Sequence, residues 1–237
     1  MRPKRSQNPR FHPTIMRSRA AIPVLTLLLV LPSSAGAAAI RGVVRVPAVR
    51  EPEHASMNPY PGRASALANP MPVAHGAVTD AVVYLEGSPP AGASPPVPSR
   101  LPKLAQRGQS FVPRVLPVAI GTRVDFPNYD PIYHNVFSVS PVKRFDLGKY
   151  ARGKSKSVVF DKPGRVNVYC EIHSGMEAFI VVLPSKWFTQ PDANGAFALP
   201  DLPAGTYSLK AWHPDFGERS ATVVVPEDKD ASVEIDF

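Results

Sequence analysis

Two short segments in the first third of the chain alternate apolar and polar residues. They are 40–49 and 77–86, the second reading AVTDAVVYLE. A period of two is typical of a strand that buries one face, so both segments are predicted to be strands. The segment between them, 51–76, contains Pro, Ala and Asn and predicts a loop. A Pro-rich segment, 88–102, offers almost no apolar side chains for a core and predicts an extended linker.

From 104 to 183 the chain consists of short apolar segments with strand character, separated by Gly and Pro. These segments read SFVPRVLPV, TRVDFPN, HNVFSV, KSVVFD, RVNVYC and AFIVVL. The tail, 184–237, continues with GAFALP, GTYSLKAWH and ATVVVP, and it contains a predicted turn at 192–195. No segment has the period of an amphipathic helix of ordinary length. The pattern therefore predicts an all-β fold of the sandwich or barrel class.

The first 39 residues have the three parts of an export signal. Basic residues precede an apolar run at 22–31, and small residues follow at 33–39. Cleavage is expected after Ala37 or Ala39, which predicts a periplasmic or otherwise exported protein. The apolar run is short for a membrane span, so none is expected after cleavage, and an uncleaved anchor is the alternative.

Removal of the signal changes the charge of the chain from strongly basic to nearly neutral. The whole chain has 27 Lys/Arg and 19 Asp/Glu, and the signal contains six of the Lys/Arg and no Asp/Glu. The remaining 21 against 19 provide no broad basic face, so nucleic-acid binding is not expected. A local basic cluster between 143 and 156 is interpreted as a solvated loop rather than a docking patch for an acidic partner.

Cys170 is the single cysteine of the chain, so it cannot form a disulfide within it. It lies in the segment YCEIHSGMEAFI, where His173 and Met176 follow at intervals of three residues. Thiolate and imidazole bind copper strongly, and a thioether is a ligand that copper accepts but zinc and hard cations rarely use. A trigonal Cys and two His with a weak axial Met need one more histidine, which His134 supplies from an earlier strand. The sequence therefore predicts one copper site with His134, Cys170, His173 and Met176 as ligands.

Each of these residues also has an ordinary explanation when taken alone. A buried Cys is commonly an inert apolar residue, and Met is commonly part of a core. A zinc site would need Glu171 or Glu177 as its fourth ligand and would leave Met176 unexplained. A Cys–His nucleophile lacks a nucleophile-elbow or helix signal here, so the chain is not expected to be an enzyme. His213 is expected to pack at a strand end rather than to bind a second metal.

The region 104–183, roughly a third of the chain, resembles the cupredoxins, the family of plastocyanin, amicyanin and pseudoazurin. The family pattern runs from a Gly before a strand through an F-x-N-x-D turn and H-N-V to a late P-G-x-x-x-x-Y-C-x-x-H loop that ends at Met. The matching residues are Gly121, Asn128, Asp130, His134, Asn135, Val136, Pro163, Gly164, Tyr169, Cys170, His173 and Met176. The two-residue gap before Met176 is most similar to that of amicyanin.

This resemblance implies an eight-stranded Greek-key sandwich that holds one type 1 (blue) copper ion. It also implies that Asn135 ties the two ligand segments together by hydrogen bonding, and that electrons pass through the exposed edge of His173. The expected function is to shuttle single electrons between a donor and an acceptor protein, both unidentified. Storage or delivery of copper without redox cycling is the alternative.

The tail resembles the carboxypeptidase-regulatory-like modules, which are small prealbumin-like β-sandwiches. The matching residues are Asp192, Gly195, Phe197, Leu199, Leu202, Pro203, Gly205, Tyr207 and Leu209. In that family two strands precede the turn, and 42–46 and 81–85 look like them. We therefore expect the copper domain, 104–183, to be inserted into a second module made of 40–103 and 184–237. An extended arm over 40–103 is the alternative.

Overall fold

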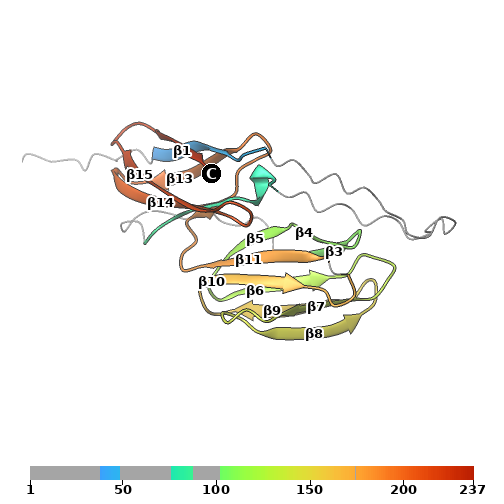
Figure 1. The fold of residues 1–237 in the computed structure, drawn as a ribbon. Coiled ribbons are helices and arrows are strands. Elements are labelled where there is room, and N and C mark those ends of the chain that lie inside the picture. The colour runs from blue at the N-terminus through green and yellow to red at the C-terminus, as the bar shows by residue number, and fades with distance from the viewer. Residues whose placement is uncertain (1–37, 49–75, 88–101, 174) are drawn as a thin grey trace, which may run out of the picture. The chain divides into compact units, whose positions relative to one another are not determined.

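The structure is a computed structural model that describes residues 38–48, 76–87, 102–173 and 175–237. All of them belong to the compact unit Ala35–Phe237. Their regular structure is β-sheet apart from one turn of 3-10 helix, η1 (Val78–Asp80), so the prediction of an all-β fold is confirmed (Figure 1). A helix long and apolar enough to cross a membrane does not occur in these ranges.

Most of the predicted signal segment, loop and linker lies outside the described residues. Ala38 and Ala39, which the sequence assigned to the signal, are described and begin β1 (Ala38–Arg45). Both alanines are buried, and the amide of Ala39 donates to Oδ1 of Asp230 at 2.9 Å. Cleavage after Ala37 would leave β1 intact, whereas cleavage after Ala39 would remove its first two residues.

One sandwich contains the first and last strands of the described chain, and we call it the terminal sandwich. Its sheets have the strand orders β13-β1-β16 and β12-β2-β14-β15. β1 pairs antiparallel with β13 and parallel with β16, and a common core of apolar side chains lies between the sheets. The resemblance of this sandwich to a regulatory-like module, and its boundaries, stay predictions. Its strands besides β1 are β2 (Val82–Leu85), β12 (Phe188–Thr189), β13 (Ala196–Leu202), β14 (Gly205–His213), β15 (Gly217–Val225) and β16 (Ala231–Asp236).

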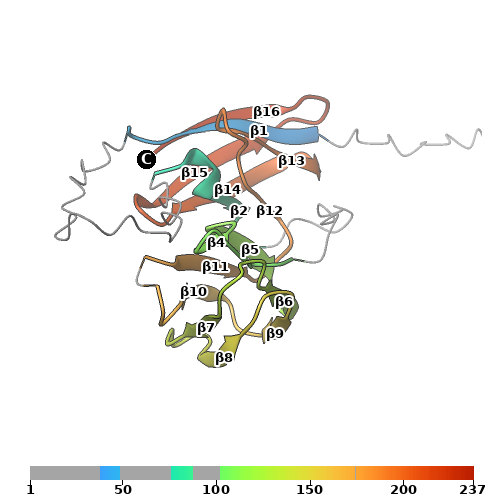
Figure 2. The same ribbon diagram turned by 90° about the vertical axis from the view of Figure 1, so that its right-hand side faces the viewer.

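The other sandwich is formed by the strands from β3 to β11, and we call it the central sandwich. One sheet has the order β5-β11-β10-β7-β8, and the other side consists of the pairs β3-β4 and β6-β9, which are linked by two isolated bridges (Figure 2). The described residues of this sandwich form nine strands, where the resemblance implied eight. They are β3 (Ala105–Arg107), β4 (Ser110–Val112), β5 (Val115–Ala119), β6 (Thr122–Pro127), β7 (His134–Ser138), β8 (Phe145–Tyr150), β9 (Ser155–Phe160), β10 (Gly164–Tyr169) and β11 (Glu177–Leu183).

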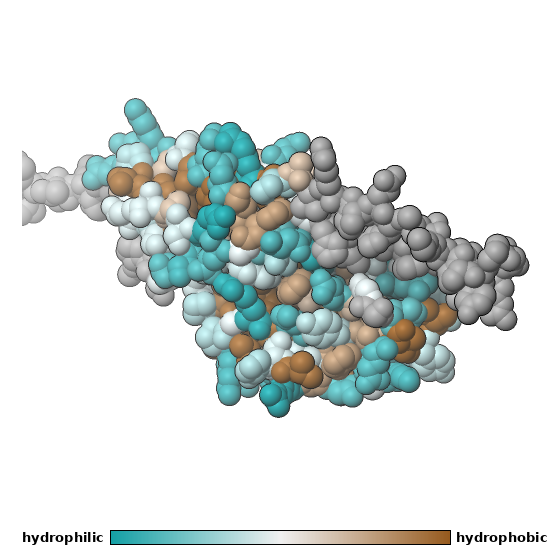
Figure 3. Space-filling view, in the orientation of Figure 1, coloured by the Kyte–Doolittle hydropathy of each residue, from teal (hydrophilic) through white to brown (hydrophobic). Residues whose placement is uncertain are grey.

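The core of the central sandwich follows the alternation seen in the sequence. Val166 and Val168 of β10 are fully buried and belong to the same apolar cluster as Phe126 and Phe160 from the other side. Full burial of such a side chain stabilises the fold by about 1.5–3 kcal/mol. The face in Figure 3 is accordingly mostly hydrophilic, with separate apolar patches. The same cluster continues to Cys170 and Met176, so the chemistry lies at one end of the core.

Several strands differ from the predictions, among them β2, β8 and β16. The residues 78–80 form η1, and the second strand begins only at Val82. β8 lies where the sequence predicted a solvated basic loop. The prediction missed this strand because it is an edge strand in which only Tyr150 is buried, so its apolar alternation is weak. β16 was not predicted, although its sequence ASVEID alternates apolar and polar residues, and its parallel pairing with β1 appears only in the structure.

The turn predicted at 192–195 is confirmed. The carbonyl of Asp192 accepts the amide of Gly195 at 2.9 Å, and its Oδ1 accepts the amides of Asn194 and Ala196. The carbonyl of Gly195 in turn accepts the amide of Val44 at 2.8 Å. The turn therefore lies directly against β1.

Replacement of Gly195 by Ala is expected to destabilise the terminal sandwich. Gly195 has a φ of +84°, and an added Cβ would lie 2.2 Å from the carbonyl oxygen of Val44. The left-handed backbone and the backbone clash together should lower the free energy of unfolding by more than about 2 kcal/mol. Denaturant unfolding measures this loss.

Gly217→Ala is the matched control, because Gly217 has a φ of +79° but nothing within 4 Å of the added Cβ. Its expected loss is about 1–2 kcal/mol, from the left-handed conformation alone. Equal losses in the two variants would contradict the close approach of the turn to β1.

Candidate metal centre

The strands of the central sandwich bring the four predicted ligands to one end of a sheet. His134 is the first residue of β7, Cys170 directly follows β10, and Met176 directly precedes β11. β10 and β11 are antiparallel neighbours, so Cys170 and Met176 lie at the two ends of one connecting loop that also carries His173. β7 is the neighbour of β10 on its other side, which brings in His134 from a distant part of the sequence.

Three of the predicted ligands meet with their donor atoms close together. Sγ of Cys170 lies 3.8 Å from Nδ1 of His134 and 3.9 Å from Nδ1 of His173. All three donor atoms lie within 4.8 Å of one another. Donors that share one ion at metal–ligand distances of 2.0–2.3 Å are separated by about 3.5–4 Å in a trigonal arrangement, so this group fits a metal ion. Within the described ranges it is the only group of three or more His, Cys, Asp or Glu side chains that could hold one.

Met176 is the last residue of the loop, and its backbone is hydrogen-bonded to both His173 and Cys170. Its amide donates to the carbonyl of His173 at 3.0 Å, and its carbonyl accepts the amide of Cys170 at 3.3 Å. The side chain is buried in the same apolar cluster as Cys170. His134 and Cys170 are also buried, whereas His173 is only half-buried. Of the four residues, His173 is thus the one that reaches solvent, and the ligand roles of all four stay predictions.

Asn135 links the two segments that carry the donors. Its Oδ1 accepts the amide of Glu171 at 2.9 Å, and its Nδ2 donates to Oδ1 of Asp146 at 3.0 Å. Asn135 is itself buried, and both bonds connect it to residues at the partly exposed rim of the site. The position of Cys170 relative to His134 is therefore fixed by a side-chain hydrogen bond as well as by strand pairing.

Asp130 contacts the predicted ligand His134, a contact that was not predicted from the sequence. Oδ2 of Asp130 lies 2.8 Å from Nε2 of His134, on the opposite side of the ring from Cys170. The carboxylate also accepts the amides of Gly108 and Gln109 at 2.6 and 2.9 Å. Burial alone would raise the pKa of Asp130, but these hydrogen bonds lower it below its usual value.

The sequence had matched Asp130 only as a family position. A signal was nevertheless present, because Asp130 precedes His134 by four residues across a Pro-containing turn, and carboxylates commonly orient metal-binding imidazoles. The pair fixes which nitrogen of His134 faces Cys170. A proton on Nε2 can be donated to Asp130, which leaves Nδ1 free to bind a metal.

The surroundings of Cys170 favour its thiolate. Burial opposes ionisation of the thiol, but hydrogen bonds from His134, from the amide of Asn135 and from His173 lower the pKa of Cys170 to about 6. A thiolate is the form of cysteine that binds metals. The site therefore combines one soft anionic donor with two imidazoles in a largely buried pocket of side chains.

Several solved structures are similar to part of this chain. No protein-family model matches the chain, and no curated protein matches it. A purple cupredoxin from Nitrosopumilus maritimus has 20% identity and a TM-score of 0.33, and the match covers 35% of this chain and 99% of that one. A Cu(I) form of an amicyanin variant has 21% identity and a TM-score of 0.34, with 39% and 95% covered.

A copper-containing nitrite reductase from Thermus scotoductus is also similar in part. It has 29% identity and a TM-score of 0.34, and the match covers 41% of this chain but only 27% of the reductase. TM-scores this low carry no argument about the site. The assignment of the metal centre therefore depends on its own residues and their geometry.

Loss of the Asn135 side chain is expected to loosen the site. In Asn135→Ala the amide of Glu171 loses its acceptor, and the free energy of unfolding should fall by about 0.5–1.5 kcal/mol, the net contribution of one hydrogen bond. Thermal or denaturant unfolding of the metal-free protein measures this change, and a titration with Cu(II) should show weaker binding.

Asn167→Ala is the matched control. Asn167 lies on β10, and its Nδ2 donates to Oη of Tyr169 at 3.1 Å in a partly buried hydrogen bond. We expect a smaller loss of stability and unchanged metal binding for this variant. The same loss of metal affinity in both variants would contradict a specific link through Asn135.

Proposed function

We propose that the chain is an exported type 1 (blue) copper protein that transfers single electrons between partner proteins. The observation that carries the proposal is the convergence of one thiolate and two imidazole nitrogens within 4.8 Å at the end of a sandwich core. Met176, buried beside Cys170 in the same cluster, supplies the fourth donor. Bound by His134, Cys170, His173 and Met176, one copper ion would supply a centre that alternates between Cu(I) and Cu(II).

The surroundings of the donors favour copper over zinc. A structural zinc site normally has four Cys, His or carboxylate ligands. Neither nearby carboxylate belongs to the group of converging donors: Glu171 is exposed, and Glu177 lies 3.4 Å from a guanidinium nitrogen of Arg114. A buried thioether in the fourth position is instead typical of copper.

The way the donors are held favours electron transfer over release of the metal. Strand pairing, the Asn135–Glu171 hydrogen bond and the Asp130–His134 pair each restrict a donor segment. A site whose ligands are fixed in this way changes little when the metal changes its charge, which favours rapid electron exchange. Delivery of copper to another protein would require these buried contacts to open.

The exposed surface near His173 is the proposed contact for redox partners. His173 is half-buried, its neighbour Ile172 is 44% exposed, and Tyr133, which precedes His134, is 61% exposed. An exposed apolar side chain next to a solvent-facing ligand suits brief docking of a donor or acceptor protein. Because four protein ligands leave no open position for a substrate, the proposal includes no catalytic activity.

Addition of Cu(II) to the purified protein is expected to give an intense thiolate-to-copper charge-transfer band in the visible spectrum. Cys170→Ala should abolish the band, because it removes the thiolate donor. Voltammetry should then show reversible one-electron cycling of the wild type. Absence of the band in the wild type would rule out the blue-copper assignment, and a band that is followed by metal loss on reduction would favour delivery.

Replacement of Asp130 by Asn is expected to raise the reduction potential of the copper-loaded protein. A carboxylate bonded to Nε2 of His134 makes the imidazole a stronger donor and stabilises the more highly charged oxidised ion. Removal of this charge should raise the potential by on the order of tens of millivolts, measured by voltammetry.

Asp161→Asn removes the same charge at a position where the carboxylate pairs with Lys143 rather than with a ligand. We expect little change in potential for this control. An equal shift in both variants would show that the effect is one of net charge alone.

A further inference from the structure

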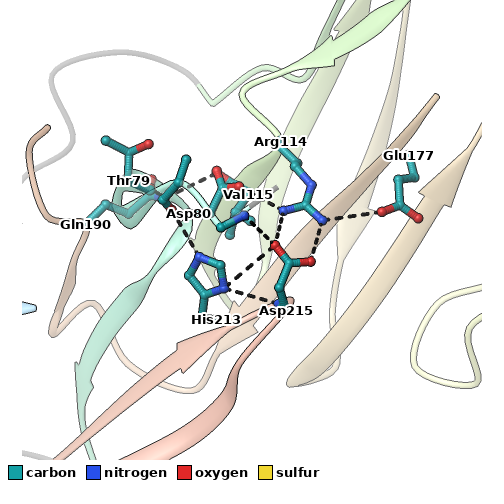
Figure 4. A network of polar contacts seen from close by, with 10 residues as sticks. Thr79, Asp80, Arg114, Val115, Glu177, Gln190, His213 and Asp215 are labelled. Atoms are coloured by element: carbon teal, nitrogen blue, oxygen red, sulfur yellow. Dashed lines mark hydrogen bonds and ion pairs between the residues drawn. The ribbon is translucent and has the colours of Figure 1, made fainter. Parts of the chain in front are cut away.

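A buried arginine joins the central sandwich to the terminal sandwich close to the metal centre. The side chain of Arg114, which directly precedes β5, is only 8% exposed. Its Nη1 donates to Oδ2 of Asp80 at 3.0 Å and to Oδ2 of Asp215 at 2.9 Å, and its Nη2 donates to Oδ1 of Asp215 at 2.9 Å (Figure 4). Nη2 also lies 3.4 Å from Oε1 of Glu177. One cation thus contacts three carboxylates.

The three carboxylates come from the two different sandwiches. Asp80 ends η1 and Asp215 follows β14, so both belong to the terminal sandwich. Glu177 is the first residue of β11 and directly follows Met176. The guanidinium is therefore bound by two carboxylates of one sandwich, and it also contacts the first residue of β11 in the other, directly after the predicted ligand Met176.

Asp215 is itself held in place within the terminal sandwich. Its amide donates to Nδ1 of the fully buried His213 at 3.1 Å, and Nε2 of His213 lies 3.0 Å from the carbonyl of Ala77 (Figure 4). His213 thus packs at the end of β14, and the bond to Ala77 ties this end to the segment that contains Asp80. A bidentate pair such as that of Arg114 and Asp215 is strong and directional, so it transmits the position of one segment to the other.

Arg114 also contacts β11 through its backbone. The carbonyl of Arg114 accepts the amide of Phe179 at 2.8 Å, and its guanidinium lies over the Phe179 ring at 5.4 Å from the centroid. The ring of Trp212, from the terminal sandwich, meets Phe179 edge to face at 5.8 Å. Val115 and Val181 lie in one apolar cluster with Val82 and Trp212. The first residues of β11 are therefore packed between their own sheet and the terminal sandwich.

We propose that Arg114, held by Asp80 and Asp215, is a positioning residue for Met176, and that the terminal sandwich is thereby part of the scaffold of the metal centre. The backbone of Met176 closes the ligand loop, and the residue that follows it is fixed by Arg114. Loss of the contacts between Arg114 and its carboxylates allows Met176, at the end of the loop, to move relative to Cys170. The consequence for copper rests on the function proposed above, whereas the consequence for the loop does not.

A second ion pair between the sandwiches provides a matched control. Nη2 of Arg165 lies 2.5 Å from Oε2 of Glu218 in β15. Arg165 is opposite Val181 in the pairing of β10 with β11, whereas the last pair next to the ligand loop is Tyr169 with Glu177. The Arg165 pair therefore joins the same two sandwiches at the end of these strands that is farther from the loop.

The first measurement needs no metal. Amide hydrogen exchange at Met176 and Cys170 in the full-length, metal-free protein is compared between wild type, Asp215→Asn, Arg114→Met and Glu218→Gln. We expect exchange at these two amides to be faster by on the order of tenfold in Asp215→Asn and Arg114→Met, and unchanged in Glu218→Gln. Arg114→Met keeps the apolar stem of the side chain without the guanidinium. If both variants respond alike, the response comes from loss of the ion pair and not from a defect peculiar to one substitution.

The second measurement uses the copper-loaded protein. A changed distance of the Met176 thioether should alter the intensity ratio of the visible bands and shift the reduction potential in Asp215→Asn but not in Glu218→Gln. Faster amide exchange and altered spectra confined to the Arg114 network would support the inference. Equal responses in all variants, or none, would overturn it. A wild type without the charge-transfer band would contradict only the proposed function, because the exchange of the metal-free protein still tests the coupling.

Discussion

The antiparallel pairing of β10 with β11 is the constraint on which the candidate metal centre depends. The last pair of this ladder, Tyr169 with Glu177, places Cys170 and Met176 at opposite ends of one short loop. Both ends are then buried in the core, because the apolar alternation of the two strands continues into them. Since β7 pairs with β10 on its other side, the same sheet also places His134 next to Cys170. The geometry of the donors is thus a consequence of the sheet register. A shift of one residue in the register would turn the side chains of the shifted strand to the other face of the sheet.

Buried polar groups around the donors turn this placement into a specific arrangement. A buried group without a partner is costly, so each polar side chain here restricts its neighbours. Asn135 bridges the two donor segments, and Asp130 selects the nitrogen of His134 that faces Cys170. The carboxylate of Asp130 is stabilised in turn by two backbone amides of the β3–β4 connection. The metal centre therefore draws on both sides of the central sandwich.

The terminal sandwich contributes in a different way, through a contact between sandwiches rather than within one. Burial opposes the charge of Arg114, but its hydrogen bonds to Asp215 and Asp80 raise its pKa, so the guanidinium stays charged. A buried charge of this kind requires its partners to stay in place, because loss of one partner leaves the charge uncompensated. The strands on either side of the central sandwich in the sequence are in this sense not separable from it.

The sequence by itself determined the all-β class, the turn at 192–195 and the grouping of Cys170, His173 and Met176, because alternation, turn residues and a spacing of three residues are local properties. His134 was found through the order of a motif, and its role with the other three stays a prediction. The edge strand β8, the strand β16 and the contacts of Asp130 and Arg114 were decided only by the tertiary structure. Each depends on partners far away in the chain: β16 on β1, Asp130 on Gly108 and Arg114 on Asp215. Such contacts follow from strand pairing and sheet packing. The alternation of ASVEID and the spacing between Asp130 and His134 are local signals, but neither specifies the distant partner.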